Sequence, residues 1–179
     1  MAIHDLTKRS IADSLRKLLK EKPFANVKVS EICRDCGCER ATFYYHFKDK
    51  YDLAAWILTD TVSAFEESAV TVGDINAGVE CLEAMAKDHV FYQRLLANTS
   101  NTFYEHMVKY YVDAFKRAAK RHTEVKELTE EVKFVINYTA HARVAIIREW
   151  LLGYSDLSAE QICRYLNDLT PEILRVYCG

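Results

Sequence analysis

The chain has 179 residues, of which 50% are hydrophobic and 28% charged. These proportions are those of a folded globular protein, so they exclude a disordered chain, and no uncharged run approaches the roughly 20 residues of a membrane helix. Five Gly and two Pro are too few for a protein of strands and turns, so the composition predicts an all-α fold.

Charge is unevenly distributed along the chain. Residues 1–52 hold 11 Lys and Arg against 8 Asp and Glu, a charge of +3, whereas residues 53–179 hold 13 against 18, a charge of −5. A basic segment ahead of an acidic body permits nucleic-acid binding through the first segment. The first residues show no apolar export signal, and six Cys without one indicate reduced thiols, so we expect a cytoplasmic protein with no membrane span.

Caps and breakers divide the chain into helices with short connections. Pro23 ends the first helix, because its ring disfavours a helical residue before it. Ser30, Asp49 and Ser158 are expected N-caps, and Gly37 suits the left-handed residue that ends a helix. The expected helices span residues 5–21, 30–36, 39–47, 50–69, 76–88, 90–97, 102–121, 124–152 and 158–169, and Pro171 opens a final short one.

The helices expected over 30–36 and 39–47 form a helix-turn-helix pattern. Phe43 and Phe47 lie one turn apart and are expected to hold the buried face of the second helix. The opposite face is then open to the major groove of DNA, where it meets phosphates and base edges. The side chains suited to these contacts are those of Lys28, Ser30, Arg40, Thr42, Tyr45, His46 and Lys50.

This segment resembles the TetR/AcrR family of transcriptional regulators over residues 5–60. The resemblance is carried by Val29-Ser-Glu-Ile32, by Cys36-Gly-Cys-Glu-Arg-Ala-Thr-Phe-Tyr-Tyr-His-Phe47 and by Lys50-Tyr-Asp-Leu53. It implies phosphate contacts from Ser30 at a helix start and base reading by Arg40 and Tyr45. The DNA-contacting positions that it implies are Thr42, Tyr44, Tyr45, His46 and Lys50.

Two further features refine the resemblance. Glu39 stands where the family usually has Ser or Thr, and its carboxylate would repel a phosphate or accept from a cytosine amine. The stretch FYYHFKDKYDLAAWI, with Phe91-Tyr-Gln-Arg-Leu-Leu96 and Arg148-Glu-Trp-Leu151, resembles a branch that includes activators of dihydroxyacetone-kinase operons. Members of that branch respond to a kinase-like partner protein.

Three cysteines lie close together at Cys33, Cys36 and Cys38. Structural zinc takes four ligands, usually as two separated pairs, and no fourth ligand is evident here. Buried Cys behaves as a small hydrophobe, so core packing is the favoured interpretation, and thiol or metal sensing is the alternative. No metal and no other cofactor is predicted.

The second half of the chain offers a candidate effector pocket. Aromatic side chains with polar tips recur along the helices expected over 102–121 and 124–152, and such side chains suit an apolar pocket with a few orienting groups. The same spacing is also typical of an ordinary core. The candidate residues are Tyr92, Phe103, Met107, Tyr111, Asn137, Tyr138 and His141.

The helix over 132–152 is apolar on more than one side, which predicts burial against a second subunit. The resemblance implies a two-fold dimer formed by residues 126–152 and 158–169. Two-fold proteins read two-fold sites, so the expected DNA partner is a double-stranded inverted repeat.

These observations predict an all-α regulator, with a three-helix helix-turn-helix DNA-binding domain over 1–52 and a helical-bundle effector and dimerisation domain over 53–179. We expect a homodimeric repressor that is released by a small-molecule or protein effector. The alternatives are an activator controlled by a partner protein, a thiol or metal sensor, and a helical adaptor that binds no DNA. No Gly-rich phosphate loop, HExxH or GxSxG pattern is present, so no enzyme is predicted.

Overall fold

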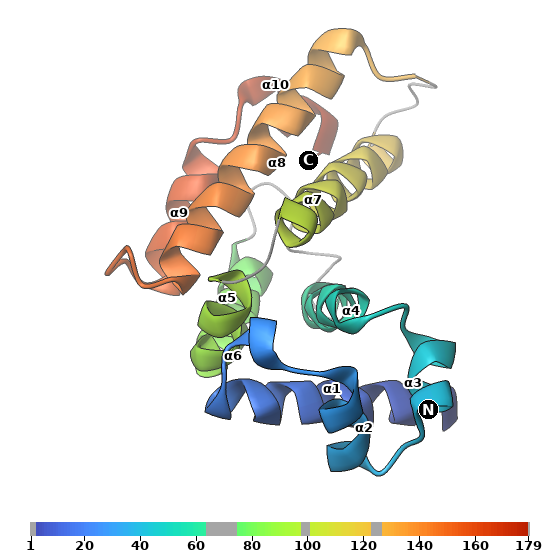
Figure 1. The fold of residues 1–179 in the computed structure, drawn as a ribbon. Helices are drawn as coiled ribbons and strands as arrows, with labels where there is room; N and C mark the ends of the chain where they lie inside the picture. The colour runs from blue at the N-terminus through green and yellow to red at the C-terminus, as the bar shows by residue number, and fades with distance from the viewer. Residues whose placement is uncertain (1–2, 64–74, 98–100, 123–126, 179) are drawn as a thin grey trace.

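The computed structural model describes residues 3–63, 75–97, 101–122 and 127–178, and in these ranges the regular elements are helices, with no strand (Figure 1). The all-α expectation is confirmed. The elements are α1 (Ile3–Glu21), a 3-10 turn η1 (Phe24–Asn26), α2 (Val29–Cys36), α3 (Arg40–His46), α4 (Lys50–Ser63), α5 (Asn76–Lys87), α6 (His89–Leu96), α7 (Asn101–His122), α8 (Glu130–Leu151), α9 (Ala159–Asp168) and α10 (Glu172–Cys178).

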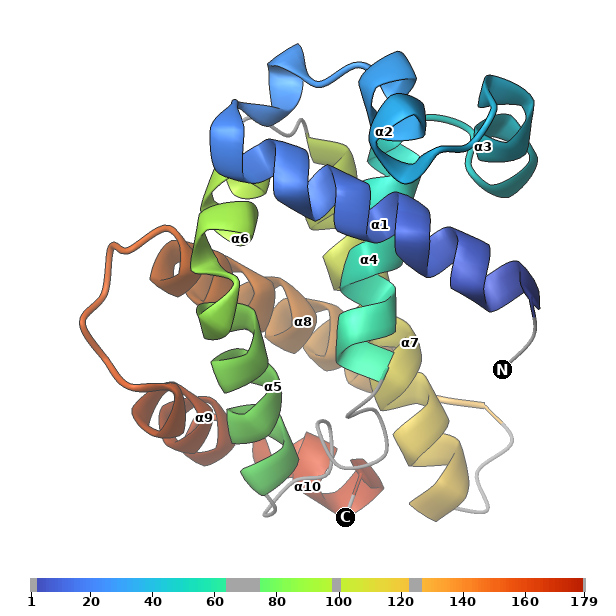
Figure 2. The same cartoon turned by 90° about the horizontal axis from the view of Figure 1, so that it is seen from below.

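The helices form two groups that share α4 and α6 as neighbours. At one end α1 packs against α2, α4 and α6, and α2 packs against α3. At the other end α7 packs against α8 and α10, and α5 packs against α9. Figure 2 shows α1 lying across α4 and α6, which therefore connect the first three helices to the rest of the molecule. Among the described helices none combines the length and hydropathy that a membrane crossing requires.

The small core between α1, α2 and α3 follows from helical spacing. Ile11, Leu15 and Leu19 line one face of α1 and are fully buried. Phe43 on α3 and Phe47, the residue that ends it, are both buried as the sequence predicts, with ring centroids 5.9 Å apart. Because burying one such side chain contributes about 1.5–3 kcal/mol, this core holds two short helices that would not be stable alone.

Most of the predicted caps are confirmed. Asp49 Oδ1 accepts hydrogen bonds from the backbone N–H groups of Tyr51 (2.8 Å) and Asp52 (2.9 Å) at the start of α4. Ser158 and Gln161 form a reciprocal capping box at the start of α9. The predicted continuation of α4 to residue 69 lies outside the described residues.

Two predicted helix starts are wrong. Ser30 is not an N-cap, since α2 begins at Val29 after Lys28, and the Glu31 carboxylate accepts from the Lys28 backbone N–H at 2.9 Å. The helix expected from residue 124 begins at Glu130, where the Thr129 hydroxyl accepts from the backbone N–H of Val132 at 3.2 Å. In both cases a side chain near the start captures one of the helix's unpaired N–H groups and so fixes the boundary.

Candidate DNA-binding surface and effector cavity

The turn between α2 and α3 sets the direction of the second helix. Gly37 has φ +69°, a left-handed conformation that favours glycine over any residue with a Cβ. The next backbone N–H, that of Cys38, donates to the carbonyl of Cys33 at 3.0 Å, which closes the end of α2. The chain then turns into α3 with Phe43 and Phe47 facing the core.

The opposite face of α3 is exposed to solvent. Tyr45 is 76% exposed and Tyr44 is 49% exposed. Arg40 is also exposed, and its guanidinium lies over the Tyr44 ring with Nη2 3.4 Å from the phenol oxygen. This contact orients a cationic fork along the helix, a geometry that suits bidentate contact with a guanine edge or a phosphate.

The other residues predicted to contact DNA lie around this face and differ in their exposure to solvent. Lys28 and Ser30 are exposed at the beginning of α2. Thr42 and His46 are half-buried on α3. Glu39, the N-cap residue of α3, is exposed, and its side chain makes no capping hydrogen bond. The structure thus places these residues on adjoining parts of α2 and α3.

Lys50 has an additional structural role that the sequence does not reveal. Its ammonium donates to the carbonyl oxygens of Phe24 (2.8 Å), Ala25 (3.0 Å) and Val27 (2.9 Å), which lie in and after η1. These bonds hold the segment before α2 against the start of α4. A contact between Lys50 and a DNA phosphate stays a prediction, and it would compete with these three hydrogen bonds.

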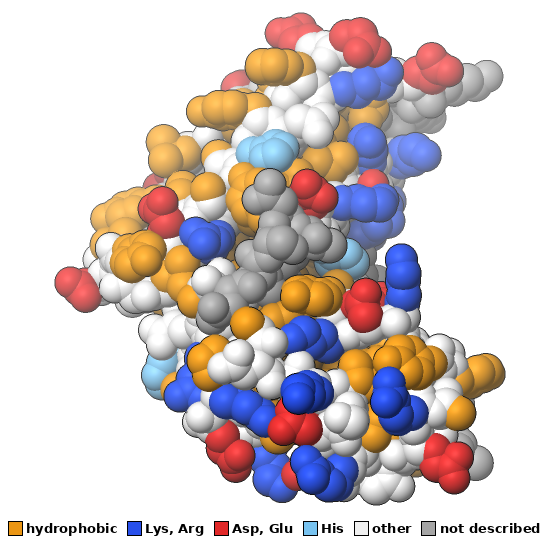
Figure 3. All heavy atoms as spheres, in the orientation of Figure 1, with side chains coloured by type: hydrophobic (Ala, Val, Ile, Leu, Met, Phe, Trp, Pro, Cys, Tyr) orange, Lys and Arg blue, Asp and Glu red, His pale blue; other side chains and the backbone are white. Residues whose placement is uncertain are grey.

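Ion pairs hold α2 against α1 and against the residue that follows α1. Lys17 pairs with Asp35 and Lys22 pairs with Glu31. The hydrogen bond from Lys22, and next the one from the Lys28 backbone N–H, lower the pKa of Glu31. In Figure 3, Lys and Arg side chains gather over the part of the molecule that contains α1–α3.

The three neighbouring cysteines make packing contacts at the turn. Cys33 is buried, and the Cys36 sulfur lies 3.3 Å from the Cys38 sulfur. Burial, and then the neighbouring thiols, raises the pKa of Cys38 to about 12, so this thiol stays protonated and is a poor nucleophile at neutral pH. Among the residues that the structure describes, no group of three or more His, Cys, Asp or Glu is arranged to hold a metal ion. These contacts favour the packing interpretation.

A cavity lies among α5, α7, α8 and α9, with a volume of about 640 Å³ when its open mouth is counted. Two of the predicted pocket residues, Met107 and Tyr111, line it. Sequence reasoning missed three others that matter chemically: Arg143, Cys163 and Asn167. The available signal was Arg143, a charged residue between Ala142 and Val144 in an otherwise apolar part of α8.

The other predicted pocket residues do not line this cavity. Tyr92 is buried elsewhere, with its hydroxyl 3.3 Å from the Thr61 hydroxyl. Asn137, Tyr138 and His141 lie on the exposed side of α8, where the Tyr104 hydroxyl is 3.1 Å from His141 Nδ1. The side chain of Phe103 lies outside the described residues.

The exposed side of α8 is unusually apolar. Phe134 is 73% exposed and Tyr138 is 63% exposed, one turn apart on α8. Tyr165 and Leu169, at the end of α9, are exposed as well. Hydrophobic side chains form a band over α8 and α9 along the upper left edge of Figure 3. A contiguous exposed apolar patch marks an interaction surface.

Comparisons with known proteins agree with this architecture. A family model described as "Bacterial regulatory proteins, tetR family" matches residues 11–56, and one described as "Transcriptional regulator C-terminal region" matches residues 77–172. The chain is 22% identical to the transcriptional activator DhaS of the Lactococcus lactis dhaKLM operon, over 85% of this chain and 83% of that protein. It is 26% identical to an HTH-type transcriptional regulator of Staphylococcus aureus strain USA300, over 66% and 72%.

Solved structures show the same fold. The dihydroxyacetone kinase operon activator DhaS superimposes with a TM-score of 0.66 at 18% identity, covering 97% of this chain and 98% of that one. A TetR regulator from Streptococcus agalactiae gives a TM-score of 0.63 at 17% identity, covering 93% and 94%. Members of the matched family are DNA-binding regulators and not enzymes. With a helix-turn-helix in α2 and α3 and a helical C-terminal region that also matches, this chain belongs to the TetR family of transcriptional regulators.

Proposed function

We propose that this protein is a homodimeric repressor that binds an inverted repeat and leaves it when an effector enters the cavity. The observation that carries this proposal is the geometry of α3, whose buried face is held by Phe43 while Arg40, Tyr44 and Tyr45 point outward. A helix held rigidly on one side and open on the other is what insertion into a major groove requires. A DNA-binding protein works where the chromosome lies, so we expect it in the cytoplasm.

The dimer is supported by the apolar band on α8 and α9. Phe134, Tyr138 and Leu169 are large, apolar and exposed in the single chain, a costly arrangement unless another surface covers them. A second copy of the same face would cover them symmetrically, since a two-fold interface places one patch against itself. Two α3 helices would then face two half-sites.

These surfaces suggest a different function for each part of the chain. Residues 1–52 would bind DNA, and residues 53–179 would bind the effector and the second subunit. The helix α4 begins at Lys50 and continues to Ser63, so it joins the two parts as one continuous helix. An effector shifts such a protein off its operator only if it binds one conformation more tightly than the other.

The deciding experiment is selection of bound duplexes from a random DNA pool at moderate salt, followed by alignment of the recovered sequences. An enriched inverted repeat supports a dimeric sequence-specific binder, and its half-site spacing measures the separation of the two α3 helices. Absence of enrichment at both moderate and low salt contradicts the proposal and favours a helical adaptor. Because phosphate contacts dominate the affinity, binding should weaken steeply as salt rises.

A second candidate is an activator controlled by a partner protein, which the similarity to DhaS favours, since DhaS is named as an activator of its operon. Transcription in vitro from a promoter that carries the selected repeat distinguishes the two. A repressor lowers transcript yield when it is added, whereas an activator raises it.

A further inference from the structure

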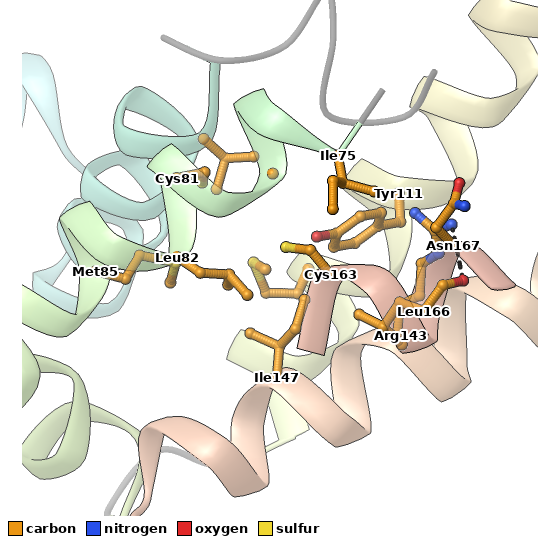
Figure 4. A pocket seen from close by; sticks show the side chains of 13 residues that line it. Ile75, Cys81, Leu82, Met85, Tyr111, Arg143, Ile147, Cys163, Leu166 and Asn167 are labelled. Carbon is orange, nitrogen blue, oxygen red and sulfur yellow. Dashed lines mark hydrogen bonds between the residues drawn. The ribbon is translucent and has the colours of Figure 1, made fainter. Parts of the chain in front are cut away.

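The cavity among α5, α7, α8 and α9 has a polar end and an apolar end. Arg143 and Asn167 lie together at one end in Figure 4, and Leu82 and Met85 lie at the other. Tyr111 stands between them, with its hydroxyl directed toward the interior. A site of this form fits an elongated ligand with one polar head and an apolar body.

Arg143 supplies the charge at the polar end. Its side chain is only 9% exposed. Nη2 donates to the Thr170 hydroxyl at 2.8 Å and lies 3.5 Å from the Leu166 carbonyl oxygen, and the guanidinium lies over the Phe115 ring at 5.2 Å. These contacts fix the orientation of a largely buried guanidinium, whose positive charge acts more strongly on a ligand than it would in bulk water.

The remaining lining adds no negative charge. Among the described residues that line the cavity there is no Asp or Glu. Burial raises the pKa of Cys163 to about 11 and that of Cys81 to about 12, so both thiols stay neutral. Burial also raises the pKa of the Tyr111 phenol, which therefore remains a neutral hydrogen-bond donor.

We infer that the cavity binds a small organic monoanion, a carboxylate on an unbranched or slender apolar body. The carboxylate would meet the guanidinium of Arg143, with the amide of Asn167 as a further donor, and the body would lie between Leu82 and Ile147. One fixed cation with no acidic neighbour in the lining matches one negative charge, whereas a doubly charged phosphate would leave a charge uncompensated. An ammonium head would be repelled.

This inference rests on the proposed function in one respect, since it takes the cavity to be the effector site. The binding of the ligand itself is tested without DNA. Three probes of equal chain length differ in the head group alone: octanoate, octan-1-ol and octylammonium. In calorimetric titrations of the full chain at neutral pH, octanoate should bind saturably and at least about tenfold more tightly than the other two. Equal or tighter binding of octan-1-ol or octylammonium overturns the inference, as does a lack of saturable octanoate binding.

Two substitutions locate the head group. Asn167→Asp places a carboxylate at the half-buried polar end, and Arg143→Met removes the cation. Each should weaken octanoate at least about tenfold. Arg164→Gln is the matched control, because Arg164 is exposed on α9 and does not line the cavity. If Arg143→Met fails to fold, the octanoate affinity of Asn167→Asp alone tests the position of the head group. Unchanged octanoate affinity in the folded variants overturns the assignment.

DNA binding is then measured separately with and without octanoate. Saturable, Arg143-dependent octanoate binding that leaves duplex affinity unchanged supports the ligand class and contradicts release by this ligand. If the chain binds the duplex but does not prefer octanoate, the proposed DNA-binding function is supported and the proposed carboxylate ligand is contradicted. The two failures are therefore distinguishable.

Discussion

Arg16 on α1 forms an ion pair with Asp88, the single residue between α5 and α6. The same guanidinium lies 4.8 Å from the centroid of the Phe91 ring on α6. Nearby, Arg94 on α6 donates to the carbonyl of Leu19 at 2.8 Å. Since α5 lines the cavity and α1 packs against α2, these contacts connect the proposed effector cavity to the helix-turn-helix.

Asp88→Ala should therefore weaken operator binding several-fold, although Asp88 lies on the α5–α6 junction and not on the DNA-binding surface. Without the Arg16–Asp88 ion pair, α1 can adopt other orientations in the free protein. Restoring the orientation that binds DNA then costs free energy, which lowers the affinity for the operator. The direction is diagnostic, because simple removal of a negative charge would strengthen binding to DNA. Fluorescence anisotropy with the selected duplex measures the effect, and Asp156→Ala, exposed in the connection between α8 and α9, is the control. Tighter binding by Asp88→Ala would contradict the coupling.

Lys50→Ala should destabilise the DNA-binding end as well as weaken DNA binding. The substitution leaves three carbonyl oxygens without the ammonium that they accept from. Hydrogen bonds to a charged group contribute about 1.5–3 kcal/mol, so we expect a loss of free energy of unfolding of that order. Urea unfolding followed by circular dichroism measures it. Lys48→Ala, at an exposed position two residues away, should change stability by less than about 0.5 kcal/mol.

The elements whose signals are local could be predicted from the sequence. Helical spacing places Phe43 and Phe47 on one face, Gly37 suits a left-handed turn, and the carboxylate of Asp49 lies next to the N–H groups that it accepts from. Each of these depends on residues within one or two turns. The sequence favours Ser30 as a cap, whereas in the structure Lys28 is the N-cap residue and its backbone N–H donates to the Glu31 carboxylate.

The cavity could not be predicted in the same way, because its lining comes from helices far apart in the chain. Arg143 on α8 meets Thr170 after α9, and Gly78 on α5 approaches so closely that an added Cβ would lie 3.2 Å from the Cys163 sulfur. Periodicity along one helix cannot tell a side that faces a cavity from one that faces solvent. For this reason the sequence pattern predicts a pocket position for Tyr138 and His141, although they lie on the exposed side of α8.

Phe134→Asp should convert the proposed dimer to monomers. The side chain is 73% exposed in the single chain, so the change should leave the fold intact while placing a charge in the proposed interface. Analytical ultracentrifugation gives the oligomeric state, and affinity for an inverted repeat should fall at least about tenfold while that for a half-site is retained. Val176→Asp, 68% exposed on α10 and outside both the DNA-binding end and the proposed interface, is the control. A dimer that survives Phe134→Asp would place the interface elsewhere.

Acid should weaken the link between α1 and α2. The pKa of Glu31 is lowered in the folded chain, first by the hydrogen bond from Lys22. The stabilisation is therefore complete above the ordinary glutamate pKa of about 4.3 and is lost as the pH falls through the folded value. The difference in Tm between the wild type and Glu31→Gln should be largest near neutral pH and shrink in acid. Glu172→Gln, at an 86% exposed carboxylate, should show a flatter profile, and a constant Glu31→Gln difference would contradict this role.

Arg40 and Lys28 should differ in what they contribute to DNA recognition. Arg40 is aligned by Tyr44 on the exposed face of α3, so Arg40→Ala should cost about 1–3 kcal/mol at one base position and relax the preference there. Lys28 lies at the start of α2, so Lys28→Ala should weaken all duplexes alike and reduce the salt slope by about one. Duplex selection repeated with each variant, together with salt titrations, separates the two effects. If Arg40→Ala keeps the full base preference, base reading belongs to another residue of α3, and Tyr45, the most exposed aromatic on that helix, is the next to substitute.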